Sequence, residues 1–261
     1  MLTLEPFYRA ALEPKAPPPP TPRRVTGLLF AYNLDETDDG TRYPFDSKGP
    51  DLSTVVNAPD NPVGGGMINE AMQGDSTQYV KSTDASIETT LDGLGNCTWS
   101  FWYKRTDTTA NRFTIGGFGY KSPSLEVGGL TGSYVYHRFF FNNVNSYSFY
   151  EYVPNTVFDL DDGNWHHLLY TFDGSQANAD KIKMYYDGVD MSTLLSTFYV
   201  ASSSATAIVM TRSEMEIGAG VNGSMPISGS IDLYGLWNYT MTPEEVSYEY
   251  NGGSGQAFVA E

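Results

Sequence analysis

Large apolar side chains on both faces of an extended run mark residues 163–188 as the centre of the predicted fold. From Trp165 to Phe172 both the odd and the even positions carry aromatic, aliphatic or strand-favouring residues. This pattern is typical of a strand that is buried on both faces. A second apolar run, IKMYY, follows a polar loop, and an Asp-Gly pair ends each run at 173–174 and 187–188. Gly adopts the positive φ of a tight turn and Asp can bond its own turn backbone, so the pattern predicts a central β-hairpin.

Other extended patterns lie on both sides of this hairpin. Residues 98–104, TWSFWYK, place Trp99, Phe101 and Tyr103 on one face of a strand. Buried aromatic side chains stabilise a core by roughly 1.5–3 kcal/mol each, so we expect them in the core. Cys97, just before them, is also expected to be buried. Further strands are predicted at residues 25–34, 77–82, 85–90, 113–120, 134–141 and 215–218, and a closing strand that pairs with the first one is predicted from residue 229.

The end of the chain carries the signals of a short helix. Thr242 precedes Pro243, and Glu245 stands three residues after the threonine, which is the pattern of a capping box with Pro at the first helical position. Asn251 and the two glycines after it tolerate the left-handed conformation found beyond a helix end. The pattern predicts a helix to Tyr250, which we expect to plug one end of the fold.

Three motifs together resemble one known family. WHHLLYTFDG followed by IKMYYDG is similar to the central hairpin of laminin-G-like jelly rolls in the concanavalin A-like lectin/glucanase superfamily. Residues 98–104 resemble an earlier core strand of that family, and residues 229–253 resemble its closing strand and short terminal helix. The resemblance implies an all-β jelly-roll sandwich over roughly residues 25–253. The family is functionally broad, so the fold alone does not give an activity.

Composition and charge limit the classes of function. An aromatic content of 14% with 26 Gly favours strands and turns, and all-β folds of 261 residues are commonly one domain. We therefore expect one jelly-roll domain at residues 25–261. The net charge of −16 repels phosphate backbones, so nucleic acid is not an expected partner. Cys97 is the only cysteine, so no disulfide can form within the chain.

Residues 1–24 differ from the rest of the sequence. An apolar stretch precedes KAPPPPTPRR, whose prolines favour an extended polyproline II spacer. We interpret residues 1–24 as an N-terminal attachment arm, and an undocked tail is the alternative. The stretch has no signal-peptide pattern and the chain has no membrane-spanning run, so neither export by a standard signal nor membrane insertion is expected. The predicted contact residues of the arm are Leu2, Leu4, Phe7, Tyr8 and Leu12.

The acidic residues of the segment 35–51 suggest a calcium site. Hard cations prefer carboxylate and carbonyl oxygens on irregular loops, although a solvated acidic loop would show the same composition. The Asp-Ser-x-Gly sequence from Asp46 to Gly49 resembles a structural calcium segment of the jelly-roll family, and Asp232 matches a further ligand on the closing strand. The resemblance therefore implies a structural Ca²⁺ held by Asp46 and Asp232.

Candidate ligand contacts lie in the segment 134–155. His137 stands mid-strand, and one face of a sandwich in this superfamily commonly binds ligands, although a mid-strand His is often structural. Tyrosine and asparagine are dense in 142–155, which suits stacking on a sugar ring and hydrogen bonds to its hydroxyls, and equally suits a protein interface. The candidate glycan or partner contacts are His137, Tyr147, Tyr150 and Tyr152.

The sequence carries no complete catalytic pattern that we can identify. Retaining glycosidases need two carboxylates about 5 Å apart, and glucanases of this superfamily show Glu-x-Asp-x-x-Glu or a close variant. Glu214 and Glu216 would share a strand face, but the partner Asp pattern is missing, and a strand edge explains them better. We therefore expect a protein that is not an enzyme.

Two functional hypotheses follow. The first is a structural or interaction protein of a viral particle, such as a bacteriophage virion, in which the arm binds other virion proteins and the jelly roll, as capsid decoration or tail component, displays a glycan-binding face. It would be made in the host cytoplasm and reside in the virion. The alternative is a lectin-like carbohydrate-binding module, and a glycoside hydrolase ranks below both.

Overall fold

The computed structural model of the chain describes residues 25–36, 40–57, 59, 65–105, 112–118, 124–128, 134–140, 148–154, 162–177, 180–191, 198–200, 206–210, 212–220 and 223–258. The predicted attachment arm, residues 1–24, and Tyr147 lie outside these residues.

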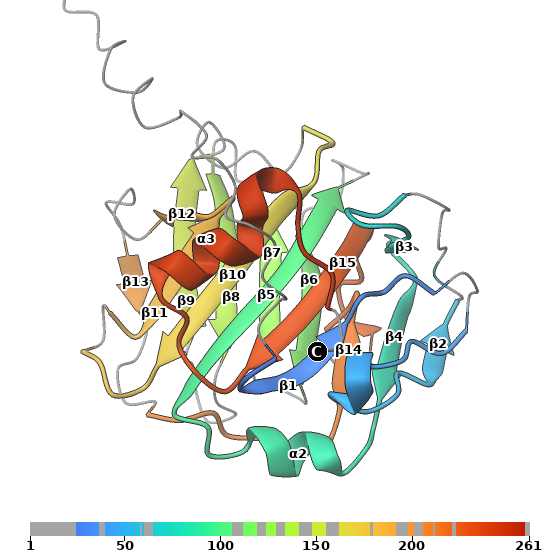
Figure 1. Cartoon of the computed structure of the whole chain (residues 1–261), viewed down its shortest axis with the longest axis horizontal. Helices are drawn as coiled ribbons and strands as arrows, with labels where there is room; N and C mark the ends of the chain where they lie inside the picture. The colour runs from blue at the N-terminus through green and yellow to red at the C-terminus, as the bar shows by residue number, and fades with distance from the viewer. Residues whose placement is uncertain are drawn as a thin grey trace, which may run out of the picture.

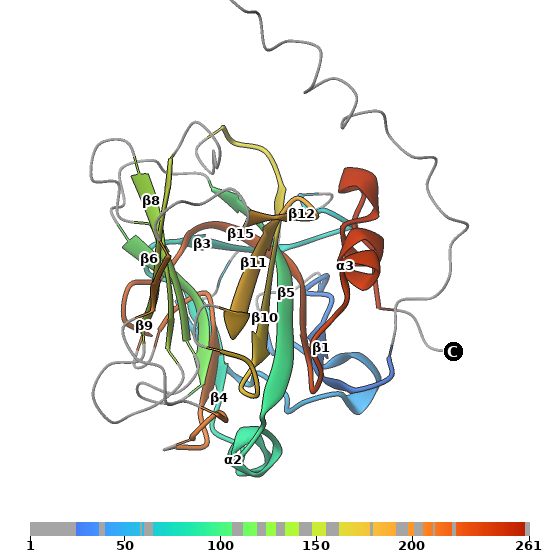
Figure 2. The ribbon, with the colours of Figure 1, turned by 90° about the vertical axis from the view of Figure 1, so that its left-hand side faces the viewer.

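Two antiparallel sheets face each other and form a β-sandwich (Figures 1 and 2). The first sheet has the strand order β1-β15-β5-β10-β11-β12, with β3 also paired to β15, and the second has the order β13-β9-β8-β7-β6-β14-β4-β2. The strands of the first sheet are β1 (Leu28–Tyr32), β3 (Met72–Asp75), β5 (Asn96–Arg105), β10 (His166–Asp173), β11 (Ile182–Tyr186), β12 (Val189–Asp190) and β15 (Ser228–Trp237). Those of the second are β2 (Thr54–Val56), β4 (Tyr79–Ser82), β6 (Arg112–Phe118), β7 (Ser124–Gly128), β8 (Tyr134–Phe140), β9 (Ser148–Pro154), β13 (Phe198–Val200) and β14 (Met215–Ile217).

The predicted central hairpin is confirmed. β10 pairs with β11, and its other edge pairs with β5 along its whole length, so that Leu168 lies opposite Phe101. All residues of β10 before Asp173 are buried, as the apolar pattern on both faces predicts. The expected pairing of the first and closing strands is also present, between β1 and β15.

Aromatic side chains fill the space between the two sheets. Trp99 packs against Phe118 of the opposite sheet with ring centroids 5.3 Å apart, and Tyr234 lies edge-on to Trp99 at 5.6 Å. Phe101 stacks on Tyr234 at 6.4 Å. These side chains are almost fully buried, as is Cys97, which confirms their predicted place in the core.

The outer face of the first sheet is also covered. The helix α3 (Pro243–Tyr250) lies across it, on the side away from the second sheet (Figure 2). Val246 is buried there against Leu169 and Trp237 in a second apolar cluster, and Tyr250 stacks on Trp102 at 5.9 Å. The predicted plug over one end is therefore wrong, because the apolar residues of the outer sheet face, rather than an open end, attract the apolar side of the helix.

The predicted boundaries of α3 are confirmed in detail. The Thr242 side chain accepts a hydrogen bond from the Glu245 amide, and the Glu245 carboxylate accepts one from the Thr242 amide at 2.8 Å. Asn251 adopts the left-handed conformation at the end of the helix, with φ of 49°. The short 3₁₀ turn η5 (Asn251–Gly253) follows.

The strand predicted at residues 85–90 is wrong, because this segment forms the helix α2 (Ser86–Leu91). Its β-branched residues favour a strand locally, but Ile87 and Leu91 are four residues apart and both are buried in the core between the sheets. Asp84 accepts a hydrogen bond from the Ser86 amide at 2.8 Å, where the helix begins. Burial of one helical face therefore outweighs the local strand preference.

Candidate functional site

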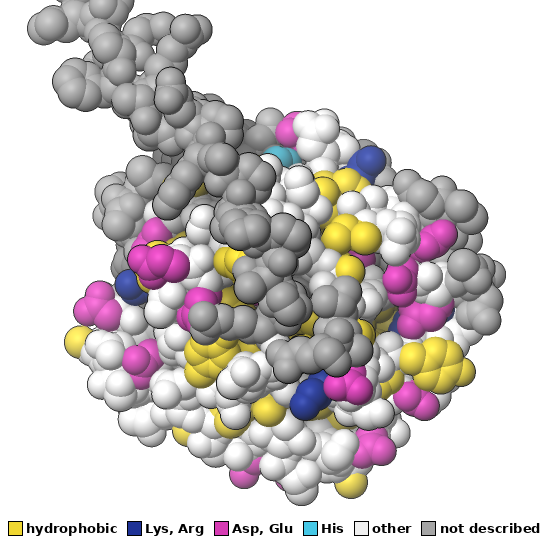
Figure 3. All heavy atoms as spheres, viewed as in Figure 1, with side chains coloured by type: hydrophobic (Ala, Val, Ile, Leu, Met, Phe, Trp, Pro, Cys, Tyr) yellow, Lys and Arg dark blue, Asp and Glu magenta, His cyan; other side chains and the backbone are white. Residues whose placement is uncertain are grey.

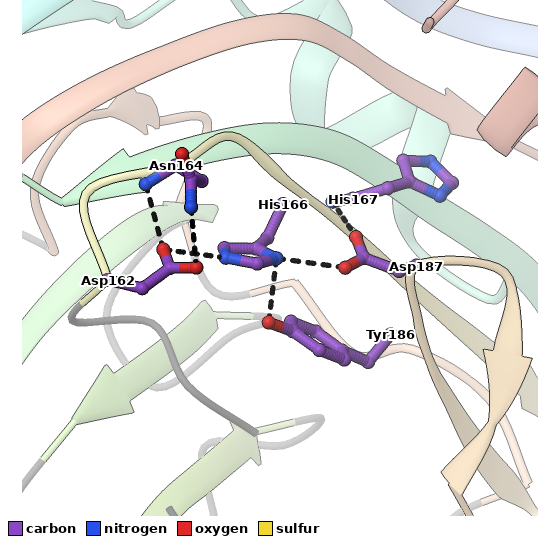
Figure 4. A network of polar contacts seen from close by, with 6 residues as sticks. All are labelled: Asp162, Asn164, His166, His167, Tyr186 and Asp187. Atoms are coloured by element: carbon purple, nitrogen blue, oxygen red, sulfur yellow. Dashed lines mark hydrogen bonds and ion pairs between the residues drawn. The ribbon is translucent and has the colours of Figure 1, made fainter. Parts of the chain in front are cut away.

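A network of polar side chains joins the start of β10 to the end of β11 (Figure 4). His166 is its centre. The Nδ1 atom of His166 lies 2.9 Å from Asp187 Oδ2 and its Nε2 atom lies 3.0 Å from Asp162 Oδ1. The Tyr186 hydroxyl lies 2.6 Å from Nδ1, and the Tyr186 ring stacks on the imidazole with centroids 4.9 Å apart.

The Asp-Gly turn positions this network. Asp187 adopts a left-handed conformation with φ of 49°, which lets it bond the opposite strand at two points. Its carboxylate accepts a hydrogen bond from the His167 amide at 2.9 Å, and its own amide donates to the His167 carbonyl oxygen at 2.9 Å. On the other side, Asn164 donates both its backbone and its side-chain N–H groups to the Asp162 carboxylate. The His166 imidazole thus joins the turn before β10, which contains Asp162, to the turn after β11, which contains Asp187.

The electrostatics of the network favour a charged imidazole. Burial acts to lower the pKa of His166, but hydrogen bonds and charge from Asp187 and Asp162 outweigh it and raise that pKa above its usual value. Burial acts to raise the pKa of Asp162, but hydrogen bonds from Asn164 and His166 lower it overall. Both ring nitrogens of His166 are engaged by carboxylates, so neither is free to bind a metal or to face a substrate. The arrangement therefore clamps the hairpin.

A serine and a histidine also meet on the outer face of the first sheet. Ser100 Oγ lies 2.8 Å from His167 Nε2, and both residues are fully buried. The His167 ring packs against Trp102, with centroids 5.1 Å apart, and against Tyr250, with centroids 6.1 Å apart. Because α3 supplies Tyr250 as a cover, this pair is enclosed in packed side chains and offers no room for a substrate.

The two predicted calcium ligands lie in different segments. Asp46 lies in the 3₁₀ turn η1 (Phe45–Ser47), with φ of 48°. Asp232 is fully buried on β15, where its carboxylate accepts hydrogen bonds from the amides of Met67 at 2.8 Å, Ile68 at 3.0 Å and Leu233 at 2.7 Å.

The charge state of Asp232 depends mainly on its burial. Burial raises the pKa of Asp232 to about 8 against the lowering effect of the three amide bonds, and the charge of Asp35 adds to the rise. Over the described ranges, no three His, Cys, Asp or Glu side chains converge as metal ligands. Calcium binding by Asp46 and Asp232 stays a prediction.

The candidate contacts on β8 and β9 fall on two faces of the second sheet. Tyr150 pairs with Arg138 and Tyr152 pairs with Tyr136, whereas His137 pairs with Glu151. Successive strand residues alternate between faces, so Tyr150 and Tyr152 share one face and His137 occupies the other. The backbone register therefore does not bring His137 together with the two tyrosines.

The register also tells which face is outward. A Cβ atom at Gly116 would lie 3.4 Å from the Trp99 ring and 3.2 Å from the Tyr234 hydroxyl, so the Gly116 position faces the core. Gly116 pairs with Leu125, and that register continues through Phe139 to Phe149. These positions form the inward face, and the alternate positions form the outward one. Tyr150 and Tyr152 therefore occupy outward positions.

Three further residues join this outward face and were not singled out from the sequence. Tyr199 of β13 pairs with Tyr150, and Glu126 of β7 pairs with Arg138. Tyr136 pairs with Tyr152. The alternation in YVYHRFFF could have identified Tyr136 as a neighbour of Arg138, but nothing in the sequence signals that Tyr199, about fifty residues later, lies beside them.

The acidic pair Glu214 and Glu216 does not lie at a sheet edge. β14 is an interior strand that pairs with both β6 and β4, and Glu216 is fully buried. Glu214 lies 3.5 Å from the Lys81 ammonium group. The strand-edge interpretation is therefore wrong, because β4 pairs with one edge of β14 and β6 with the other. The sequence alone does not reveal these pairings.

Comparisons with known proteins agree with this architecture. A family model described as the concanavalin A-like lectin/glucanases superfamily matches residues 74–247. No curated protein matches the chain. Within the described residues, no helix combines the length and apolar character needed to cross a membrane.

Solved structures with the same fold include sugar-binding proteins at low sequence identity. Domain 4 of AbnA, an extracellular arabinanase from Geobacillus stearothermophilus in complex with arabinotriose, has a TM-score of 0.54 and 17% identity over 84% of this chain and 96% of that one. The receptor-binding domain of botulinum neurotoxin C/D mosaic serotype has a TM-score of 0.58 and 12% identity over 87% of this chain and 51% of that one. A structure of botulinum neurotoxin type C, whose cell entry depends on two ganglioside molecules, has a TM-score of 0.57 and 10% identity. This chain spans about half the length of the toxin chains. At these identities the likeness concerns the fold alone.

Proposed function

This chain belongs to the concanavalin A-like lectin/glucanases superfamily, and from that premise we propose that it is a non-enzymatic module that binds glycans on the outward face of its second sheet. The observation that carries the proposal is the register of three adjacent strands, which places Tyr136, Tyr150, Tyr152 and Tyr199 at neighbouring outward positions. Arg138 and Glu126 lie in the same row as Tyr150.

The chemistry of these residue types suits a saccharide. Neighbouring strands lie about 4.8 Å apart, so three strands span about 10 Å, which is enough for one or two sugar rings. Tyrosine rings stack on the apolar faces of sugars, and a guanidinium or carboxylate group bonds the hydroxyls around the ring edge. The arabinotriose and ganglioside in the names of the similar structures support a saccharide as the ligand class.

We also propose that the module does not catalyse a reaction. Both ring nitrogens of His166 are engaged by carboxylates, and the Ser100–His167 pair is enclosed under α3. Neither arrangement supports a nucleophile or a general base that a substrate could reach.

Substitution of the tyrosines tests the proposal. Tyr150→Ala and Tyr152→Ala are each expected to weaken binding to an oligosaccharide array that includes arabinotriose and ganglioside headgroups by roughly tenfold, because each removes a stacking surface. Tyr43→Ala is the matched control, since Tyr43 is 61% exposed and belongs to none of these strands. Binding that is unchanged in both strand variants would contradict the proposed site. Wild-type protein that binds no saccharide would contradict the function itself.

We further propose that the module is displayed on a viral particle, as capsid decoration or as part of a tail. The support comes from the sequence of residues 1–24, an apolar stretch followed by a proline spacer, which suits attachment to other virion proteins. A lectin-like module without such attachment is the alternative.

A further inference from the structure

A groove of about 330 Å³ lies on the outer face of the first sheet, on the opposite side of the sandwich from the tyrosine positions. Its lining includes Thr171 of β10, Lys183 and Tyr185 of β11, and Met241 from the segment that leads into α3. Thr171 and Lys183 are direct partners across the two strands, and Tyr185 lies two residues further along the same face. The groove has a size at the lower end of the range for small-ligand sites.

Both walls of the groove are held in place by hydrogen bonds. Thr240 donates its hydroxyl to the Phe172 carbonyl oxygen at 3.1 Å, and the Met241 amide donates to Thr98 Oγ1 at 2.9 Å. At the other side, Asp173 accepts hydrogen bonds from Ser175 and Gln176, which fixes the turn after β10. The groove therefore exists before any ligand binds, so little conformational entropy is lost on binding.

Two hydroxyl groups, those of Thr171 and Tyr185, line the groove. Thr171 and Tyr185 are each only 2% exposed. In the part of the chain that the structure describes, neither side-chain hydroxyl makes a hydrogen bond. Neither hydroxyl oxygen is itself sealed from solvent, so each can bond water in the groove, and a ligand hydroxyl can take the place of that water.

The charges around the groove favour a neutral ligand. Two acidic residues, Asp173 and Asp180, and two basic residues, Lys181 and Lys183, line it, so their formal charges balance and the groove does not select for an ion of either sign. Burial and the charge of Asp190 raise the pKa of Tyr185 to about 12, so its hydroxyl stays protonated and can donate. The side of the molecule that carries α3 shows many acidic side chains and few basic ones (Figure 3).

We propose that this groove is a second saccharide subsite, which holds one neutral sugar residue whose hydroxyls bond the Thr171 and Tyr185 hydroxyls and the Lys183 ammonium group, while Met241 contacts the apolar face of the ring. The inference rests on the proposed function for the class of ligand. The two surfaces lie on opposite faces of one sandwich, so a single molecule would join two glycan chains.

The test uses NMR on the full chain labelled at its methionine methyl groups, with the Met241 signal assigned through Met241→Leu. The probes are arabinotriose, maltotriose and sialyllactose. At least one neutral trisaccharide is expected to shift the Met241 methyl signal. Tyr185→Phe and Thr171→Val, which keep the shape of the packed side chains, are each expected to weaken that binding fivefold or more. Tyr43→Phe is the matched loss of an exposed hydroxyl and is expected to leave the binding of the trisaccharide unchanged.

The outcomes separate this inference from the proposed function. The groove is not a subsite if no probe shifts the Met241 signal, or if Tyr185→Phe and Thr171→Val both bind as the wild type does. This conclusion holds even where Tyr150→Ala abolishes binding at the tyrosine face. A Met241 shift caused by sialyllactose alone would overturn the assignment to a neutral sugar. A Met241 shift by a neutral trisaccharide that needs Tyr185 but persists in Tyr150→Ala and Tyr152→Ala would support the subsite, even where the tyrosine face itself fails.

Discussion

At the scale of single residues, His166 couples the stability of the hairpin to pH. Its pKa is raised in the folded protein, so the folded state binds this proton more tightly than the unfolded state does. The stabilisation is then fully present below the ordinary pKa of histidine, near 6.5, and is lost as pH rises through the raised value.

His166→Gln is expected to lower the free energy of unfolding by about 1 kcal/mol at pH 6, because it removes a charge-assisted bond to each of two partly exposed carboxylates. The difference from the wild type should shrink as pH rises to 9. Thermal melts at pH 6, 7, 8 and 9 measure it, and Asp162→Asn, which weakens the same clamp from the other side, should show the same trend. A difference that stays constant with pH would rule out the charged imidazole.

The proposed calcium site is a second prediction at this scale. If Asp46 and Asp232 hold Ca²⁺, a chelator should lower the melting temperature of the wild type and should have no effect on Asp46→Ala. Asp35→Asn serves as a comparison, because Asp35 acts on Asp232 through its charge but is not a proposed ligand. Identical melting curves with and without chelator would show that no Ca²⁺ stabilises this fold.

Prediction from sequence succeeded for some residues and failed for others for physical reasons. The aromatic residues of β5 are core residues because their size and alternation leave no other place for them. The His166 clamp could not be foreseen, because it depends on Asp162 and Asp187, which approach only when two turns meet. His137 and Tyr150 lie on different faces of the sheet because of the strand register. Alternation within one strand separates its residues into two faces, but only the pairing that leads to Gly116 shows which face is inward.

At the scale of elements, local chemistry alone determines where α3 begins and ends. Thr242, Glu245 and Asn251 act within a few residues of each other, so the sequence predicted them correctly. The face of the sandwich that α3 covers depends instead on distant residues such as Leu169 and Trp237, which explains the wrong prediction of a plug. α2 shows the same limit, because its helical form depends on the core against which Ile87 and Leu91 pack.

Loss of the cap of α3 is expected to destabilise the protein measurably. Thr242→Ala removes the side-chain acceptor for the Glu245 amide and should lower the free energy of unfolding by about 1 kcal/mol. Ser247→Ala, an exposed change in the middle of the same helix, is the control and should have little effect. Chemical denaturation measures both. Equal stability of Thr242→Ala and the wild type would show that packing of Val246 and Tyr250, rather than the cap, determines the stability of α3.

At the scale of the whole molecule, the proposed attachment depends on residues 1–24. A chain without these residues is expected to fold, because the described core begins at β1, but to lose its association with viral particles. Sedimentation of the full and shortened chains with particles through a density gradient measures the association. A chain that replaces residues 1–24 with a Gly/Ser segment of equal length controls for the loss of length alone. Cosedimentation of the shortened chain would disprove the anchoring role.

The place of β5 in the first sheet has a consequence for biosynthesis. Both strands that flank it, β10 and β15, come later in the chain. About 130 residues separate the end of β5 from the end of β15, which at roughly 5–20 residues per second is roughly 7–26 s of translation. Trp99, Phe101 and Trp102 would lie on a strand with two open edges until β10 is complete, about 68 residues after β5, and with one open edge until β15 is complete. Open strand edges associate with other nascent chains. High expression of this protein should therefore place heavy demand on the chaperones that hold unfinished polypeptides at the ribosome.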